Sequence, residues 1–175
     1  FILSYTENAG VIHDIGKFPL VAYYGQPFLP FSKSAYQSLT KHCELGASFL
    51  AKIPRLENYT EVALYHHRHF NDVNGYPKDG SLTNSKYRSI IYIISLADCL
   101  DAATDNISRF YKPCKSFDTV MDEFRAARET QFAPEVIEVI EKDKELQKKL
   151  KSLTSEKRYT DKHTKMTYNT NSFFK

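Results

Sequence analysis

The chain has 175 residues, of which 42% are hydrophobic and 26% charged, and its formal net charge is +3 with neutral histidines. This length suits one domain with a sizeable core, and so small a net charge gives no argument for a DNA- or RNA-binding protein. No apolar run approaches the roughly 20 residues of a membrane-spanning helix, so we expect no membrane span. The three cysteines are odd in number and form no Cys-x-x-Cys pair, which favours a reducing, cytoplasmic setting.

Hydrophobic periodicity predicts helices joined by loops, and no stretch indicates paired strands, so the expected fold class is all-α. Proline, glycine and turn-forming residues predict loops over 18–33, 68–84 and 106–115. Ser34 and Ser116 are expected to cap the helices that follow them, and Pro134 fits the first turn of another. The helices are expected over residues 5–13, 34–53, 57–67, 85–105, 116–130 and 134–150.

The domain is expected to span residues 1–150, with its first helix starting upstream of Phe1. Residues 151–175 form a polar, basic tail whose structure the sequence does not predict. The charge-rich end of the helix before this tail reads as a solvated face rather than as a dimer seam. The oligomeric state stays open.

Histidines and aspartates stand at the ends or inner faces of four predicted helices. Neighbouring side chains on a helix point about 100° apart. His13 and Asp14, adjacent in VIHDIGKF, can therefore contact the same group only if that group is large and attracts both, as a metal ion does. A shared cation would also remove the cost of placing charges in apolar stretches. Four histidines and two aspartates can serve two metals, Fe, Mn or Zn, with Asp14 bridging. The candidate ligands are His13, Asp14, His42, His66, His67 and Asp98.

Each of these residues also has a simpler explanation. A single histidine on an apolar face is more often a hydrogen-bonded core residue, and an exposed His-His pair carries no chemistry. The joint order of the residues, on separate helices, is what favours a metal site.

Two metals a few ångströms apart hold a hydroxide between them and polarise a phosphoryl oxygen, as phosphoester hydrolysis requires. Lys17, one turn beyond Asp14, is a candidate for binding a phosphate oxygen, although a solvated lysine at a helix end is the simpler alternative. Arg109 and Lys112, in SRFYK, are candidates for a second phosphate or a guanine edge. Cations are favoured at a helix C-terminus in any case.

Four segments of the chain, HDIGK, KHCELG, HHRHFNDVNGYP and ISLADCLDAATDNISRFYK, resemble the HD-GYP domain, a branch of the HD metal-dependent phosphohydrolases. The resemblance covers roughly residues 8–145. It implies an HD-domain helical bundle whose helices converge on two or three divalent metals, Fe or Mn before Zn. It also implies attack of a metal-bridged hydroxide on cyclic di-GMP, giving pGpG and then GMP, in the output module of a bacterial signalling protein.

Position by position, the resemblance makes the six candidate ligands named above the metal ligands, with Asp14 as the bridge. It gives Asp14 and Lys17 catalytic roles, and it places Lys17, Tyr76, Arg109 and Lys112 against the dinucleotide. Gly75, Tyr76 and Pro77 would form the GYP loop, which shapes the cleft and is a candidate contact for GGDEF or sensor domains.

The chain departs from the family pattern in three places. No histidine precedes His13, Arg68 and VNGYP replace the usual glutamate and GSGYP, and Phe110 replaces a proline in a longer loop. Two alternatives therefore stay open. One is a phosphodiesterase for another cyclic dinucleotide, such as cyclic GMP-AMP, or for a nucleotide. The other is a non-catalytic module that binds a nucleotide or a partner protein.

Overall fold

The structure, a computed structural model, describes residues 2–24, 33–105 and 113–155, with backbone alone over 21–24. Within these ranges the chain forms helices and two isolated β-bridges but no strand, which confirms the all-α expectation. None of the described helices is both long enough and apolar enough to cross a membrane. The elements in chain order are α1 (Ile2–Ile12), α2 (Lys17–Tyr24), α3 (Lys33–Leu39), α4 (His42–Leu50), the 3₁₀ turn η1 (Glu57–Tyr59), α5 (Thr60–Tyr65), α6 (Arg88–Thr104), α7 (Phe117–Ala126), α8 (Pro134–Lys142) and α9 (Lys144–Leu153).

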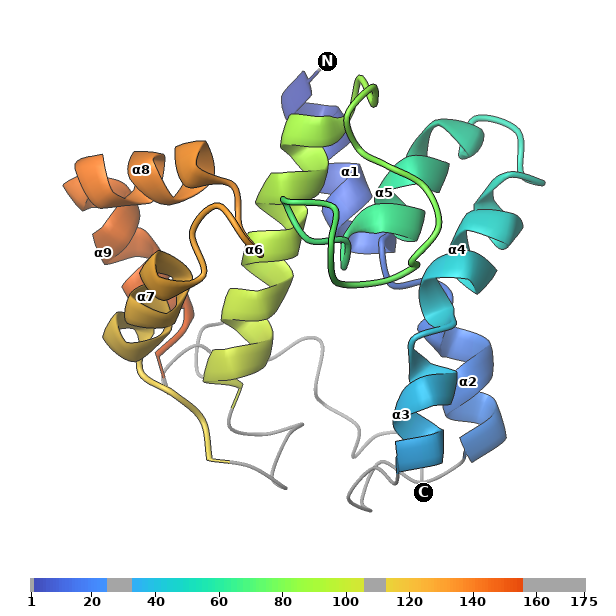
Figure 1. The fold of residues 1–175 in the computed structure, drawn as a ribbon, viewed down its shortest axis with the longest axis horizontal. Coiled ribbons are helices and arrows are strands. Elements are labelled where there is room, and N and C mark those ends of the chain that lie inside the picture. Colours follow the sequence, from blue (N-terminus) through green and yellow to red (C-terminus); the bar gives the residue numbers. More distant parts are fainter. Residues whose placement is uncertain (1, 25–32, 106–112, 156–175) are drawn as a thin grey trace, which may run out of the picture.

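Helix α6 runs through the middle of the molecule and separates two hydrophobic cores (Figure 1). On one side Ile91 and Ile94 pack with residues of α1 and α5, and on the other Leu96 and Leu100 pack against α7 and α8. Each fully buried aliphatic side chain contributes about 1.5–3 kcal/mol, so the two cores together fix the position of α6. Asp98 therefore lies on a helix that is packed on both sides.

The helix expected over 34–53 is two helices, because the chain turns at Thr40 and Lys41. The Thr40 hydroxyl donates to the carbonyl of Gln37, and the amide of Lys41 donates to Ser38 three residues back, a tighter step than the α-helix uses. His42 is consequently the first residue of α4 rather than a mid-helix residue. This start of α4 places the His42 side chain at the centre of the molecule.

Two further boundaries differ from expectation. The predicted loop over 18–33 begins with helix α2, in which Pro19 lies in the first turn, where no amide hydrogen bond is needed. The helix expected over 134–150 breaks at Asp143, whose carboxylate accepts from the amide of Leu146 and so caps α9. Ser116 caps α7 as predicted, accepting from the amide of Thr119 at 3.1 Å, whereas the cap predicted at Ser34 is wrong, because Ser34 lies inside α3.

Candidate metal centre

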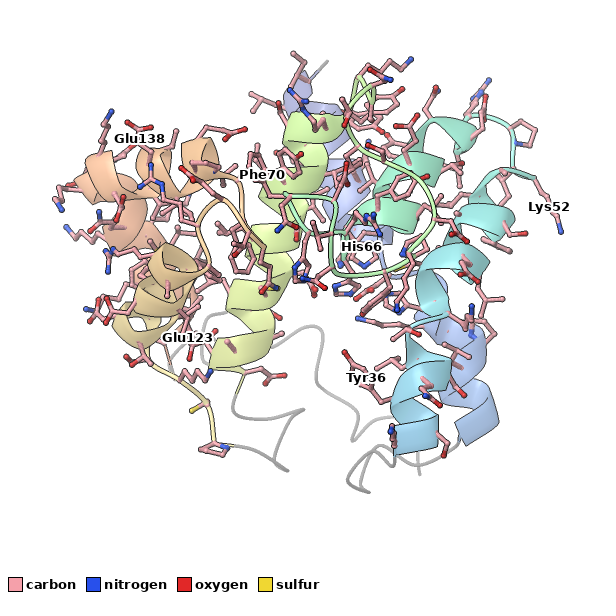
Figure 2. The ribbon with its side chains drawn as sticks, viewed as in Figure 1. Tyr36, Lys52, His66, Phe70, Glu123 and Glu138 are labelled. Atoms are coloured by element: carbon pink, nitrogen blue, oxygen red, sulfur yellow. The ribbon has the colours of Figure 1, made fainter. Side chains whose placement is uncertain are left out.

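Six side chains from four separate stretches converge at the centre of the fold. His13 and Asp14 follow α1, His42 begins α4, His66 and His67 follow α5, and Asp98 lies within α6. Figure 2 shows His66 in the space between α5 and α6, toward which Tyr36 projects from α3. The six form two groups, each with ligand atoms within 4.8 Å of one another: Asp14, His42, His66 and His67, and then His13, Asp14 and Asp98.

The first group surrounds one carboxylate oxygen. Asp14 Oδ1 lies 3.2 Å from Nε2 of His42 and 3.4 Å from Nε2 of His66, and these two nitrogens are 3.2 Å apart. The exposed fraction of both imidazoles is 0%, and the separations of 3.2 and 3.4 Å leave no space for a water molecule between them and the carboxylate. Three potential metal-ligand atoms, two imidazole nitrogens and one carboxylate oxygen, therefore face one small, enclosed volume.

The second group uses the other oxygen of Asp14. His13 Nε2 lies 3.3 Å from Asp14 Oδ2 and 3.8 Å from Asp98 Oδ1. His67 Nε2 lies 3.8 Å from Asp98 Oδ2, so Asp98 lies between His13 of the second group and His67 of the first. Asp14 belongs to both groups, and this is the position that a bridging ligand occupies.

Backbone carbonyls fix the tautomers of three histidines. Nδ1 of His13 donates to Gly10 at 2.7 Å, Nδ1 of His42 donates to Leu39 at 2.6 Å, and Nδ1 of His66 donates to Ala63 at 3.0 Å. A neutral imidazole with its proton on Nδ1 presents a lone pair at Nε2. The Nε2 lone pairs of His42 and His66 therefore face Asp14 Oδ1 and each other, an arrangement that a cation relieves and that second-shell carbonyls commonly enforce at metal sites.

Two buried atoms of the centre, His13 Nε2 and Asp14 Oδ1, have no hydrogen-bond partner among the described residues. Buried polar atoms without a partner are uncommon in folded proteins and call for an ion or water. The mixed imidazole and carboxylate set suits Fe, Mn or Zn. The residues present thus fit a divalent metal centre.

The ionisation of the centre favours cation binding at two carboxylates and two imidazoles, whereas His13 has to lose a proton first. Burial opposes protonation of His13, but the nearby carboxylates of Asp14 and Asp98 outweigh it and raise the pKa of His13 to about 10. Burial likewise opposes ionisation of the two carboxyls, yet the imidazoles around Asp14 and the proximity of Asp98 to His13 lower both pKa values. Burial lowers the pKa of His66 and of His67, which keeps these ligands neutral. Anionic carboxylates and neutral imidazoles are the forms that bind metal.

Gly16 permits this convergence. A Cβ atom at this position would lie 1.9 Å from the carbonyl oxygen of His42 and 2.5 Å from the amide nitrogen of Gly46, both of them backbone atoms. Only a glycine therefore allows the chain after Asp14 to lie directly on the start of α4. The HDIG sequence needs its glycine for this contact.

A pocket of about 550 Å³ opens onto the centre. Lys17, Tyr36 and Tyr76 line it together with His67 and Asp98. The Lys17 ammonium donates to Asp14 Oδ2, so it neutralises the centre while remaining at the pocket surface. The Tyr76 ring lies 4.7 Å from that of His67, and burial raises the pKa of its phenol, which keeps it a hydrogen-bond donor.

Arg68 holds the loop that carries Tyr76. Its guanidinium, in a residue only 6% exposed, donates to the carbonyls of Pro77 and Lys78 at 2.8 Å each, and also to the carbonyl of Asp72. Arg68 is not among the residues that line the pocket. The arginine thus organises the loop backbone rather than adding charge to the cleft.

The structure brings all six predicted ligands, Lys17 and Tyr76 together, whereas Arg109 and Lys112 lie outside the described residues. Sequence reasoning missed Tyr36, His69 and Gln131 among the pocket residues. His69 could have been suspected, because it stands two residues after His67. Tyr36 and Gln131 carry no signal in the sequence, since their place in the pocket depends on how α3 and the α7–α8 loop pack.

In comparisons with known proteins, no model of a protein family and no curated protein matches this chain.

Proposed function

We propose that the chain is a metal-dependent phosphodiesterase of the HD-GYP type that hydrolyses a cyclic dinucleotide, with cyclic di-GMP as the first candidate. The observation that carries the proposal is the pair of ligand groups that share Asp14 beneath a pocket of about 550 Å³. Ligand pockets of small molecules commonly measure about 300–1,000 Å³, so this one has room for more than a single phosphate.

His13, His42, His66, His67 and Asp98 would hold two metals with Asp14 between them. Bound in this way, divalent metals would lower the pKa of a water molecule and polarise a phosphoryl oxygen. This assignment rests on the shared position of Asp14 and on the Nε2 lone pairs that face it.

The chain's own residues would orient the phosphodiester. The Lys17 ammonium, at the pocket surface beside Asp14, is positioned to bind a non-bridging phosphate oxygen. The Tyr76 phenol, held over His67, would donate a hydrogen bond or stack on a base. Tyr36 of α3 and Ser95 of α6 would form walls of the pocket beside the scissile bond.

Metal content and hydrolysis together test the proposal. Purified wild-type protein is expected to bind Mn or Fe(II) and to open cyclic di-GMP, measured by elemental analysis and by chromatography of the products. Asp14→Asn should reduce both by more than the roughly 10–100-fold that a lost second-shell partner costs. Asp79→Asn makes the same chemical change at an exposed position outside the pocket and should leave both unchanged. Wild-type metal content and turnover in Asp14→Asn would refute the proposal.

A further inference from the structure

Part of the pocket wall is neutral and is not used by the metal centre. His69 lies in the loop that follows α5, and Gln131 lies in the loop between α7 and α8. Lys17 and Tyr36 line the same pocket, and their helices α2 and α3 lie across α6 from α7 and α8 (Figure 1). A ligand whose phosphate lies beside Lys17 would therefore extend toward His69 and Gln131.

Backbone hydrogen bonds tie these two loops together. The amide of Phe70 donates to the carbonyl of Gln131 at 3.1 Å, and the amide of Asn71 donates to that of Thr130 at 3.1 Å. The Gln131 amide in turn donates to Ala127 at 2.9 Å. The two side chains are thus presented from one connected, hydrogen-bonded surface rather than from independent loops.

Neighbouring residues restrict both positions further. His69 donates its backbone amide to Asn74 at 3.2 Å, and its ring edge packs so closely on Gly75 that a Cβ there would lie 2.8 Å from its Cδ2 atom. Gln131 precedes Phe132 and Ala133, both of which are buried in the hydrophobic cores. These contacts preorganise the pair, which lowers the entropic cost of binding a ligand.

The side-chain groups of His69 and Gln131 have no hydrogen-bond partner among the described residues. An imidazole offers one donor and one acceptor when neutral, and a glutamine amide offers both a carbonyl oxygen and an NH₂ group. Such uncharged pairs of donors and acceptors match the edges of nucleobases, which also carry both donors and acceptors, whereas a phosphate offers acceptors alone.

We propose that His69 and Gln131 form a purine-binding subsite that accepts either guanine or adenine, an inference that rests on the cyclic dinucleotide substrate proposed above. Both purines present an N7 acceptor, and beside it guanine presents an O6 acceptor while adenine presents an N6 donor. His69 donates to N7. Gln131 donates from its NH₂ group to O6 of guanine. With the amide turned over, its oxygen accepts from N6 of adenine. The chain therefore tolerates both bases in this subsite.

Substitution of Gln131 tests the assignment, because each charged replacement keeps only one half of the amide. Gln131→Glu keeps only acceptors and should favour adenine, whereas Gln131→Lys keeps only donors and should favour guanine. The readout is the ratio of the dissociation constants for cyclic di-AMP and cyclic di-GMP. These are measured by calorimetry with a chelator present, so that no turnover occurs, and kcat/KM with Mn²⁺ follows. A ratio cancels the general effect of the added charge on phosphate binding.

We expect the ratio to move about tenfold in opposite directions in the two variants, because a base-edge contact is worth roughly 1–3 kcal/mol of discrimination. Asn84→Asp and Asn84→Lys alter an exposed side chain outside the pocket in the same way and should leave the ratio unchanged. An unchanged ratio in both Gln131 variants would overturn the subsite even if hydrolysis proceeds. A shifted binding ratio in a protein that hydrolyses neither dinucleotide would support the subsite and refute the proposed catalysis.

Discussion

Arg68→Met should destabilise the chain, since it removes the donors that hold the loop between α5 and α6. Because methionine retains much of the apolar stem of arginine, the change in stability reports on the lost guanidinium. In the structure this group serves three backbone carbonyls, of Asp72, Pro77 and Lys78, and it contacts the Asp72 carboxylate at 3.4 Å. A hydrogen bond to a charged group contributes about 1.5–3 kcal/mol.

The Lys78 residue is exposed, so its carbonyl can return to water, and we count the remaining two carbonyls. Losing the hydrogen bonds to these two carbonyls should lower the free energy of unfolding by about 3–6 kcal/mol. The variant no longer has to bury a charged guanidinium, which offsets part of this loss and leaves a net decrease of about 2–5 kcal/mol. For a chain of this size, 1 kcal/mol shifts Tm by about 2–4 °C, so a decrease of about 5–15 °C is expected.

Thermal unfolding followed by circular dichroism, with a chelator present, measures this effect. Arg88→Met is the matched control, because Arg88 is exposed and makes one long contact, 3.4 Å, with the carbonyl of Thr83. It should change the free energy of unfolding by less than about 0.5 kcal/mol. If both variants melt within a degree of the wild type, Arg68 does not hold the loop.

Three further predictions concern the ligands and the glycine beside them. Gly16→Ala should abolish metal binding and lower Tm, because its Cβ would lie 1.9 Å from the carbonyl of His42; Gly10→Ala, with no atom within 4 Å of the added Cβ, should be neutral or slightly stabilising. Metal binding near neutral pH should release about one proton from His13, whose pKa is raised to about 10. Calorimetry in buffers of different ionisation enthalpy measures the number of protons released, and a value of zero would contradict the assignment of His13 as a metal ligand. The folded pKa of His13 exceeds its unfolded value of about 6.5, so the stability that protonated His13 adds to the metal-free protein is fully present below pH 6.5 and declines toward pH 10. Chemical denaturation over this pH range measures the effect, and a free energy of unfolding that rose with pH would contradict it.

The convergence of the ligands could be predicted from sequence because each ligand sits beside apolar residues that have to be buried. His66 follows Val62 and Ala63, and Asp98 follows Leu96, so burying the apolar neighbours carries the polar groups inward. The same reasoning predicted a helix around each site. It needs no knowledge of how the helices cross, since every amphipathic face turns toward one interior.

Local hydrogen bonds that compete with helix continuation limited the prediction of boundaries. The turn at Thr40 depends on a hydroxyl that bonds back to Gln37, and the break at Asp143 depends on a carboxylate that caps the next helix. Both residue types also occur inside helices, so periodicity alone does not reveal the break. Gln131 was missed for another reason: its place in the pocket follows from pairing between two loops, about sixty residues apart in the chain.

The two oxygens of Asp14 face different groups of ligands, with Oδ1 toward His42 and His66 and Oδ2 toward His13. An ion at either position would set the torsion of this one carboxylate and so alter the affinity of the other position, reciprocally and by the same factor. A titration of the protein with metal should therefore not fit independent sites. Samples prepared with a single equivalent would hold a mixture of empty, half-filled and filled molecules, whose proportions depend on that coupling.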